Sequence, residues 1–230
     1  MEDGPELRDV FAALQSPSGE IRIIAEIKRA SPSKGLLSVI SDPAALAEQY
    51  ENAGANVISV LTERRRFNGA IADFTDVRAR VSTPLLRKDF IVTEYQVFES
   101  RAIGADLMLL IVAGLTQTEL RDFYDLATGL GMKVLVEVHN ESELERAIDI
   151  ESKIIGVNSR NLKTLEIDNN VFARLLPMIP DGIVKIAESG ITEREQVAAL
   201  EEIGVDAILV GETLVRSSDP RAAIIHLLGH

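Results

Sequence analysis

Short apolar runs alternate along the whole chain with longer stretches in which apolar residues recur at helical spacing. The apolar runs are rich in leucine and β-branched residues and have the length of strands. Continuous runs of this kind are typical of strands that are buried on both faces, as in parallel sheets. The predicted strands are IRIIAEIKR (21–29), NVISVLTE (56–63), PLLRKDF (84–90), DLMLLIV (106–112), KVLVEVH (133–139), KIIGVNSR (153–160), IVKIAES (183–189) and DAILVGE (206–212).

The stretches between these runs are amphipathic and predict helices. Each of the clearest three ends in glycine before the next strand, as helices commonly do. They are PAALAEQYENAG (43–54), TELRDFYDLATGLG (118–131) and REQVAALEEIG (194–204).

Helix starts are also marked, because an S/T-x-x-E/Q capping box or a similar pair follows several strands. Asp42 before Pro43 predicts an N-cap with proline at the first helical position. The boxes are Thr93–Gln96, Thr116–Glu119 and Thr192–Glu195, and Asn140 with Glu143 is close to the same pattern.

This order of eight strand–helix units predicts an α/β protein with a single (β/α)₈ TIM barrel. We expect one domain over residues 1–230, in which residues 1–20 are a short segment that precedes the first strand. A doubly wound open sheet is the main alternative, but no G-x-G-x-x-G motif follows the first strand.

Composition narrows the classes of function. No run of eighteen apolar residues is present, so we expect no membrane span. The formal net charge of −12 argues against nucleic acid and anionic membranes as partners, while an anionic small substrate stays possible if basic residues gather locally. The chain has no cysteine, which removes thiolate metal sites and cysteine nucleophiles and fits a cytoplasmic protein. We also expect a monomer.

Polar residues cluster at the ends of the predicted strands, where a barrel of this kind carries its active site. A strand-end charge can simply reach water, and for any one residue that reading stays open. Taken together, these residues favour proton-transfer chemistry. Residues two apart on a strand share a face, and opposite charges at close range perturb pKa values. The strand-end residues are Glu26, Lys28, Glu63, Lys88, Glu137, Asn158, Arg160, Glu188 and Gly211.

Glycines stand where the loops after the last two strands of such barrels usually bind phosphate. Gly190 and Gly211 allow backbone N–H groups to approach an anion, although either can be an ordinary turn residue. Ser31, Ser33 and Lys34 in the first loop are candidates for further donors or for a solvated loop. His139 follows the fifth strand, and we expect it to be a surface histidine.

Five motifs on different strands resemble those of the indole-3-glycerol phosphate synthase family. They are IAEIKRASPSKG (24–35), LRKDFIV (86–92), LVEVHN (135–140), IIGVNSRNL (154–162) and AESGI (187–191), in the order and at the spacing of the family. The resemblance implies a carboxy-lyase of tryptophan biosynthesis that needs no cofactor or metal. Its substrate, 1-(2-carboxyphenylamino)-1-deoxyribulose 5-phosphate, loses CO₂ and water on ring closure.

The resemblance also implies a role for each matching residue. Lys88 is expected to be the general acid and Glu137 its acid/base partner, with dehydration served by Glu26, Lys28 and Asn158. The other expected roles are substrate binding by Arg160, Glu188 and Ser189; phosphate binding by Ser31, Lys28, Gly190, Gly211 and the backbone N–H of Glu212; and an apolar slot for the aromatic ring formed by Phe67, Phe90, Leu109 and Leu162.

Two departures from the family pattern accompany the match. The segment before the first strand is shorter than usual, so that part of a lid over the barrel mouth is expected to be missing, and Ala70 stands where serine is more usual. Three alternatives remain: phosphoribosylanthranilate isomerase, disfavoured because its general base is a cysteine; a class I aldolase with Lys88 as Schiff-base lysine; and a lid-deficient, weakly active or inactive phosphate-binding scaffold.

Overall fold

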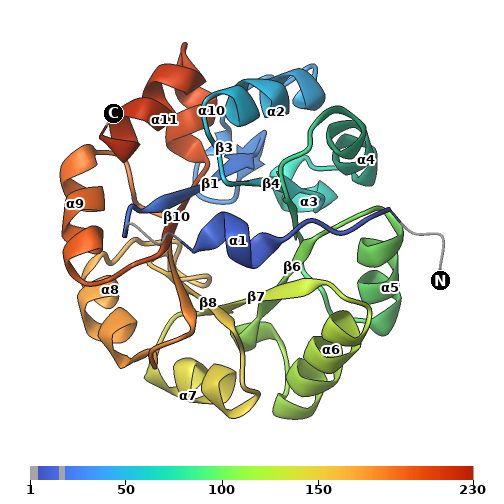
Figure 1. Ribbon diagram of the computed structural model, residues 1–230, viewed down its shortest axis with the longest axis vertical. Coiled ribbons are helices and arrows are strands. Elements are labelled where there is room, and N and C mark those ends of the chain that lie inside the picture. Colours follow the sequence, from blue (N-terminus) through green and yellow to red (C-terminus); the bar gives the residue numbers. More distant parts are fainter. Residues whose placement is uncertain (1–4, 16–18, 230) are drawn as a thin grey trace.

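A computed structural model describes residues 5–15 and 19–229 of the chain, and it confirms the (β/α)₈ barrel. All eight barrel strands run parallel, and β1 closes the barrel by pairing with both β10 and β4 (Figure 1). The barrel strands are β1 (Arg22–Ile27), β4 (Val57–Leu61), β5 (Leu85–Lys88), β6 (Leu107–Ile111), β7 (Lys133–Val138), β8 (Ile154–Asn158), β9 (Val184–Glu188) and β10 (Ala207–Val210).

Helices surround the barrel and cover the outward faces of its strands (Figure 1). Their buried side chains, such as Tyr50, Phe74 and Phe123, pack against outward-facing strand residues in one continuous apolar layer. The helices are α2 (Pro43–Asn52), α3 (Arg64–Phe67), α4 (Ile71–Arg80), α5 (Glu94–Ala102), α6 (Gln117–Gly129), α7 (Glu141–Asp149), α8 (Asn170–Leu175), α9 (Arg194–Glu202), α10 (Glu212–Arg216) and α11 (Pro220–Leu228), with 3₁₀ turns η1 (Val112–Gly114) and η2 (Leu176–Met178).

Most of the predicted helix starts are confirmed. The Asp42 carboxylate accepts from the Ala45 N–H, and Thr116 with Glu119 forms a complete capping box. At the starts of α5 and α7, the side chains of Thr93 and Asn140 accept from the backbone N–H groups of Gln96 and Glu143.

The box predicted at Thr192–Glu195 is wrong by one residue. Helix α9 begins after Glu193, and the Gln196 side chain accepts from the backbone N–H groups of both Thr192 and Glu193. Gln196 therefore lies at the third helical position that the box requires, and Thr192 lies one residue too early.

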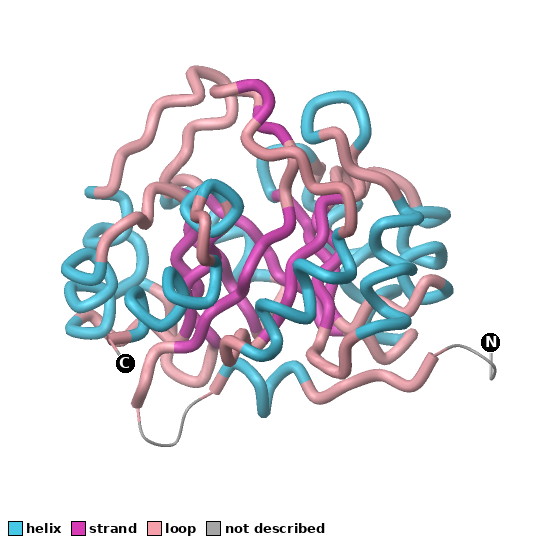
Figure 2. The backbone as a smooth tube through the Cα atoms, turned by 90° about the horizontal axis from the view of Figure 1, so that it is seen from above, coloured by secondary structure: helices cyan, strands magenta, loops and turns pink. Residues whose placement is uncertain are grey.

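The two ends of the barrel are built differently. Helix α1 (Val10–Leu14) crosses the amino-terminal end of the strands, as Figures 1 and 2 show from two directions. Its buried residues Val10 and Leu14 complete the apolar interior of the barrel together with Leu86, Leu107 and Leu135. This end is closed by hydrophobic packing.

The opposite end carries the loops that follow the strands. A small hairpin, β2 (Ala30–Ser31) with β3 (Gly35–Leu36), rises from the first of these loops and lies on the far side of the barrel from α1 (Figure 2). Among the residues that the structure describes, no helix has both the length and the apolar character needed to cross a membrane.

Helix α4 lacks a side-chain cap, because the residue at its N-cap is Ala70. The backbone of Ala70 is already extended (φ −151°, ψ 150°), as an N-cap requires, so an added hydroxyl can accept from the first turn. Ala70→Ser should raise the free energy of unfolding by about 0.5–1 kcal/mol in urea denaturation. The matched control Thr116→Ala, which removes a cap from α6, should lower stability by a similar amount. A destabilised Ala70→Ser variant would contradict this account.

Candidate active site

A cavity of about 430 Å³ opens at the carboxyl ends of the barrel strands. Every site residue that the sequence predicted lines it, so residues far apart in the chain are brought together. They are Glu26, Lys28, Ser31, Phe67, Lys88, Phe90, Leu109, Glu137, Asn158, Arg160, Leu162, Glu188, Ser189, Gly190, Gly211 and Glu212.

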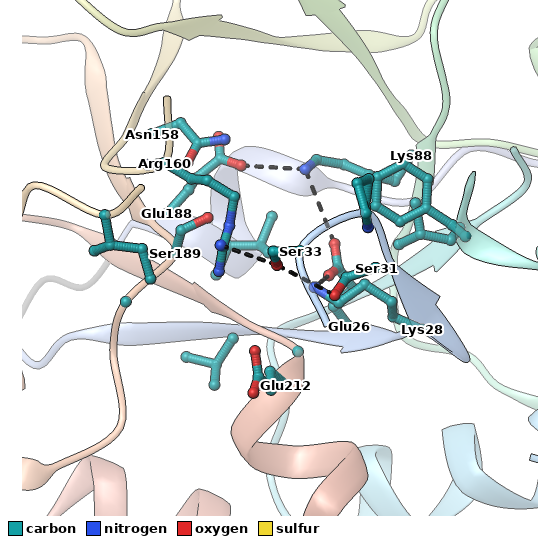
Figure 3. A pocket seen from close by; sticks show the side chains of 18 of the residues that line it. Glu26, Lys28, Ser31, Ser33, Lys88, Asn158, Arg160, Glu188, Ser189 and Glu212 are labelled. Atoms are coloured by element: carbon teal, nitrogen blue, oxygen red, sulfur yellow. Dashed lines mark hydrogen bonds and ion pairs between the residues drawn. The ribbon is translucent and has the colours of Figure 1, made fainter. Parts of the chain in front are cut away.

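Lys88, at the end of β5, lies among three buried carboxylates, of which Glu26 and Glu188 are labelled in Figure 3. Its Nζ is 3.3 Å from Glu188 Oε2, 3.6 Å from Glu137 Oε2 and 3.9 Å from Glu26 Oε2. The carboxylates come from β9, β7 and β1, which point inward at this level. One ammonium group thus faces three strands of the barrel.

This cluster sets the protonation of its members. Burial alone would lower the pKa of Lys88, but Glu188, Glu137 and Glu26 together raise it above its usual value. Burial would raise the pKa of Glu137, yet Lys88 and His139 hold it well below its ordinary range. Burial, aided by the Glu137 charge, raises the pKa of Glu188 to about 8 in spite of Lys88. Near neutral pH, Glu137 is therefore ionised while Glu188 can hold a proton.

Arg87, the neighbour of Lys88, points outward and anchors the same strand. It is 2% exposed, and its guanidinium donates to Ser100 Oγ at 3.1 Å and pairs with Glu99 at 2.7 Å, both on α5. These contacts fix β5 to its helix and so hold Lys88 on a rigid support.

The charged pair in the first strand is also confirmed as a neighbouring pair. Lys28 Nζ is 2.6 Å from Glu26 Oε1, and the Ser59 hydroxyl donates to Glu26 Oε2 at 3.4 Å. Burial opposes ionisation of Glu26, but Lys28 and Lys88 lower its pKa overall. Glu26 therefore stays charged between two ammonium groups.

Two glycines make room for these carboxylates. A Cβ at Gly156 in β8 would lie 2.1 Å from Glu188 Oε1, and one at Gly211 would lie 2.5 Å from Glu26 Oε1. Gly156 was not among the predicted site residues, although a glycine inside a strand often marks a close approach. Gly211 was predicted to bind phosphate or to be an ordinary turn residue, and its missing side chain also accommodates Glu26 and Lys28.

The predicted phosphate-binding end consists of the first, seventh and eighth loops. Ser189 and Gly190 both have positive φ (70° and 71°), which turns the backbone sharply after β9. Helix α10 begins at Glu212, and the Glu212 side chain reaches Lys34 Nζ at 2.6 Å. Lys34 therefore joins the cavity wall and is not merely solvated.

Arg160 connects two of the loops over the cavity (Figure 3). Its guanidinium donates to Ser33 Oγ at 3.1 Å and to the Leu165 carbonyl at 3.0 Å, while its backbone N–H donates to Asn158 Oδ1 at 2.9 Å. The loop after β8 is thereby tied to the hairpin after β1.

The predicted apolar slot has an aromatic wall and a cation above it. The rings of Phe67 and Phe90 lie 6.2 Å apart, and the Arg66 guanidinium lies 6.0 Å from the centre of the Phe90 ring. Arg66 was not among the predicted site residues.

Glu63 was noted as a strand-end acid. Its carboxylate accepts from the backbone N–H groups of residues 65–67 and so shapes the loop that carries Arg66 and Phe67.

The expectation that His139 lies on the surface is wrong. Its side chain is 12% exposed and lies between Glu137 and Glu143. The signal was present in the sequence, since His139 follows Glu137 by two positions and precedes Glu143 by four.

Comparison with known proteins identifies the family of this chain. The family model of indole-3-glycerol phosphate synthase matches residues 2–227. This chain belongs to that family. The synthase of Paenarthrobacter aurescens is 58% identical over 220 residues, which cover 94% of this chain and 81% of the relative. The synthase of Mycobacteroides abscessus is 54% identical over 224 residues, covering 97% and 82%.

More distant solved structures share the barrel of this synthase-family chain. The 3-hexulose-6-phosphate synthase of Salmonella typhimurium has a TM-score of 0.74 at 10% identity and covers 91% of this chain and 97% of its own. A chain of the tryptophan synthase complex of Pyrococcus furiosus has a TM-score of 0.68 at 16% identity, with coverage of 92% and 98%. At such low identity these likenesses concern the fold.

Gly156 provides a test of the carboxylate arrangement in this family member. Gly156→Ala should displace Glu188, because the new methyl group would meet its carboxylate, and stability should fall by about 1–3 kcal/mol. Urea denaturation measures the change. The control Gly129→Ala adds a methyl group with no neighbour within 4 Å and should leave stability equal or higher. Equal behaviour of the two variants would contradict the close packing at Glu188.

Removal of the Lys88 charge should make stability fall more steeply with pH than it does in the parent, where the raised pKa of Glu188 already gives a fall in the same direction. In Lys88→Met the buried carboxylates lose their cation, so their folded-state pKa values rise above those of the unfolded chain. The folded state then binds more protons than the unfolded state, and stability falls as pH rises from 5 to 8, by at least about 1 kcal/mol relative to the parent.

Denaturation in urea at both pH values measures this effect. Lys34→Met is the matched control, because the Lys34 side chain is 49% exposed, and the pH dependence of its stability should match that of the parent. A pH dependence in Lys88→Met that matched the parent would show that Lys88 does not balance the carboxylates.

Proposed function

We propose that this chain is a carbon–carbon lyase that converts 1-(2-carboxyphenylamino)-1-deoxyribulose 5-phosphate into indole-3-glycerol phosphate, CO₂ and water. The observation that carries the proposal is the ammonium of Lys88, which lies within 4 Å of Glu26, Glu137 and Glu188 in the cavity. Membership of the synthase family supplies the substrate class.

Ring closure forms a bond between the ring carbon that bears the carboxylate and the ketone carbon of the substrate. Negative charge develops on the ketone oxygen, and the Lys88 ammonium stabilises it and supplies the proton. The raised pKa of Lys88 keeps this proton in place until the charge develops, so its first contribution is electrostatic. Loss of CO₂ returns the electron pair of the breaking bond to the ring, and Glu137 serves Lys88 as acid/base partner.

Dehydration then completes the indole. The hydroxyl made from the ketone oxygen leaves as water with a proton from an acid, and a base removes a proton from the adjacent carbon. Glu26 and Lys28 supply a carboxylate and an ammonium 2.6 Å apart for these two transfers. Asn158, whose Oδ1 accepts from the Arg160 N–H, orients the substrate atoms that take part in these transfers.

Substrate binding uses the rest of the cavity. The aromatic ring fits the slot of Phe67, Phe90, Leu109 and Leu162, and Arg160, Glu188 and Ser189 hold the linking atoms. The phosphate lies at the loops that carry Ser31, Lys28, Gly190 and Gly211, with the backbone N–H of Glu212 at the start of α10. We further propose that the protein acts as a cytoplasmic monomer, without cofactor, metal or nucleic acid.

Incubation with the carboxyphenylamino-deoxyribulose phosphate tests the proposal. Indole fluorescence should rise and CO₂ should be released in equal amount, against a low background because the chain has no tryptophan. Lys88→Met should lose about 10²–10⁴ in kcat while substrate-analogue binding persists. Arg80→Met, on the exposed outer surface, is the control and should keep full activity.

Two other outcomes would replace the proposal. Trapping of a Lys88 adduct by borohydride with a carbonyl substrate would favour a class I aldolase. Tight binding of a substrate analogue with no indole product would favour the phosphate-binding scaffold.

A further inference from the structure

His139 lies behind the Glu137 carboxylate, outside the set of residues that line the cavity. Its Nε2 is 3.3 Å from Glu137 Oε1, and its Nδ1 is 2.9 Å from Glu143 Oε2. Both ring nitrogens thus face a carboxylate, one from β7 and one from α7.

This geometry requires the imidazolium form. A neutral imidazole has one N–H and one acceptor nitrogen, and an acceptor facing a carboxylate would be repelled. Burial lowers the pKa of His139, but Glu137 and Glu143 raise it to about 10. Glu143 on α7 and Glu137 on β7 are the charged groups in contact with the ring, and Lys88 on β5 acts on it through Glu137.

The two oxygens of Glu137 are divided between two cations. Oε2 faces Lys88 Nζ at 3.6 Å, whereas Oε1 faces His139 Nε2. Both Glu137 Oε1 and His139 Nε2 are buried, and among the described residues neither has an aligned hydrogen-bond partner. The ion pair between them is therefore one restraint on the carboxylate, and the Asn158 side chain also interacts with Glu137.

We propose that His139, held from behind by Glu143, is a positioning residue that orients the Glu137 carboxylate toward Lys88 and keeps it ionised for the reaction. The effect of His139 on turnover rests on the proposed function. The orientation itself is a property of the folded protein and can be measured without substrate.

A purely structural role is the main alternative, since His139 lies next to Asn140, the N-cap of α7. The start of that helix does not need the imidazole, however. The backbone N–H of His139 donates to Glu143 Oε2 at 2.9 Å, and the Asn140 side chain accepts from the Glu143 N–H at 3.0 Å. These two bonds survive a change of the His139 side chain.

Kinetics of His139→Gln test the inference. Because His139 does not line the cavity, kcat should fall about tenfold or more while KM stays nearly constant. The acidic limb of the kcat/KM profile should move to higher pH, by about 1–3 pH units, because the cation that favours ionised Glu137 is lost. Glu143→Gln, which weakens the imidazolium but leaves the ring, should move it in the same direction by less.

Thr116→Ala is the matched control for lost stability. It removes a helix cap that has no contact with the cavity, so the protein should be destabilised with no movement of the acidic limb. If His139→Gln behaved in the same way, with lower stability and an unchanged limb, the positioning role would be overturned.

NMR titration of the side chains gives a readout independent of turnover. The imidazole of His139 should stay doubly protonated well above pH 8, and the labelled carboxyl carbon of Glu137 should titrate at higher pH in His139→Gln than in the parent. A His139 midpoint near the ordinary value of about 6.5, or an unmoved Glu137 titration, would overturn the inference even in a protein that makes no indole product. An inactive parent with the expected titrations would overturn the proposed function alone.

Discussion

The attraction between Lys88 and the buried carboxylates around it is the constraint on which the rest of the site depends. Three glutamates from three strands cannot all be ionised in the interior without a cation between them. Lys28, Lys88 and the His139 imidazolium face these three carboxyls and Glu143, so one negative charge is still unbalanced. Burial and the neighbouring negative charges raise the pKa of Glu188 to about 8, so Glu188 is the carboxyl that takes up a proton. The cluster thus holds both protonated and ionised carboxyls near neutral pH, which is what a sequence of proton transfers requires.

The barrel makes this cluster possible because it fixes each charge on a strand and supports the strand from outside. Arg87 ties β5 to α5, so Lys88 cannot withdraw from the carboxylates. Gly156 and Gly211 leave the space that Glu188 and Glu26 occupy. Polar chemistry is confined to one end of the barrel, while Val10 and Leu14 of α1 close the other end by apolar packing. Stability and chemistry are therefore assigned to opposite ends of the same strands.

The architecture and most of the cavity follow from the amino-acid sequence. Unbroken apolar runs, each followed by an amphipathic stretch, specify parallel strands and covering helices through local patterning alone. Residues two apart on a strand share a face, so the pairing of Glu26 with Lys28 follows from their spacing. The motifs around Lys88, Glu137 and Glu188 indicated the family, and all the predicted site residues line one cavity.

Contacts across strands depend on the folded chain, because the distances between strands are set by barrel closure and not by local pattern. Sequence placed His139 on the surface, since a polar residue just past a strand usually reaches water, but α7 brings Glu143 against it. The sequence shows only that Gly156 lies inside a strand, and the folded chain shows that the Glu188 side chain from the adjacent strand fills the place of its missing Cβ. Arg66 reaches the cavity because Glu63 folds its loop back over Phe90. For Gly156 and Arg66 the deciding contact joins elements that come together only when the chain folds, whereas the spacing of His139 and Glu143 is local and present in the sequence.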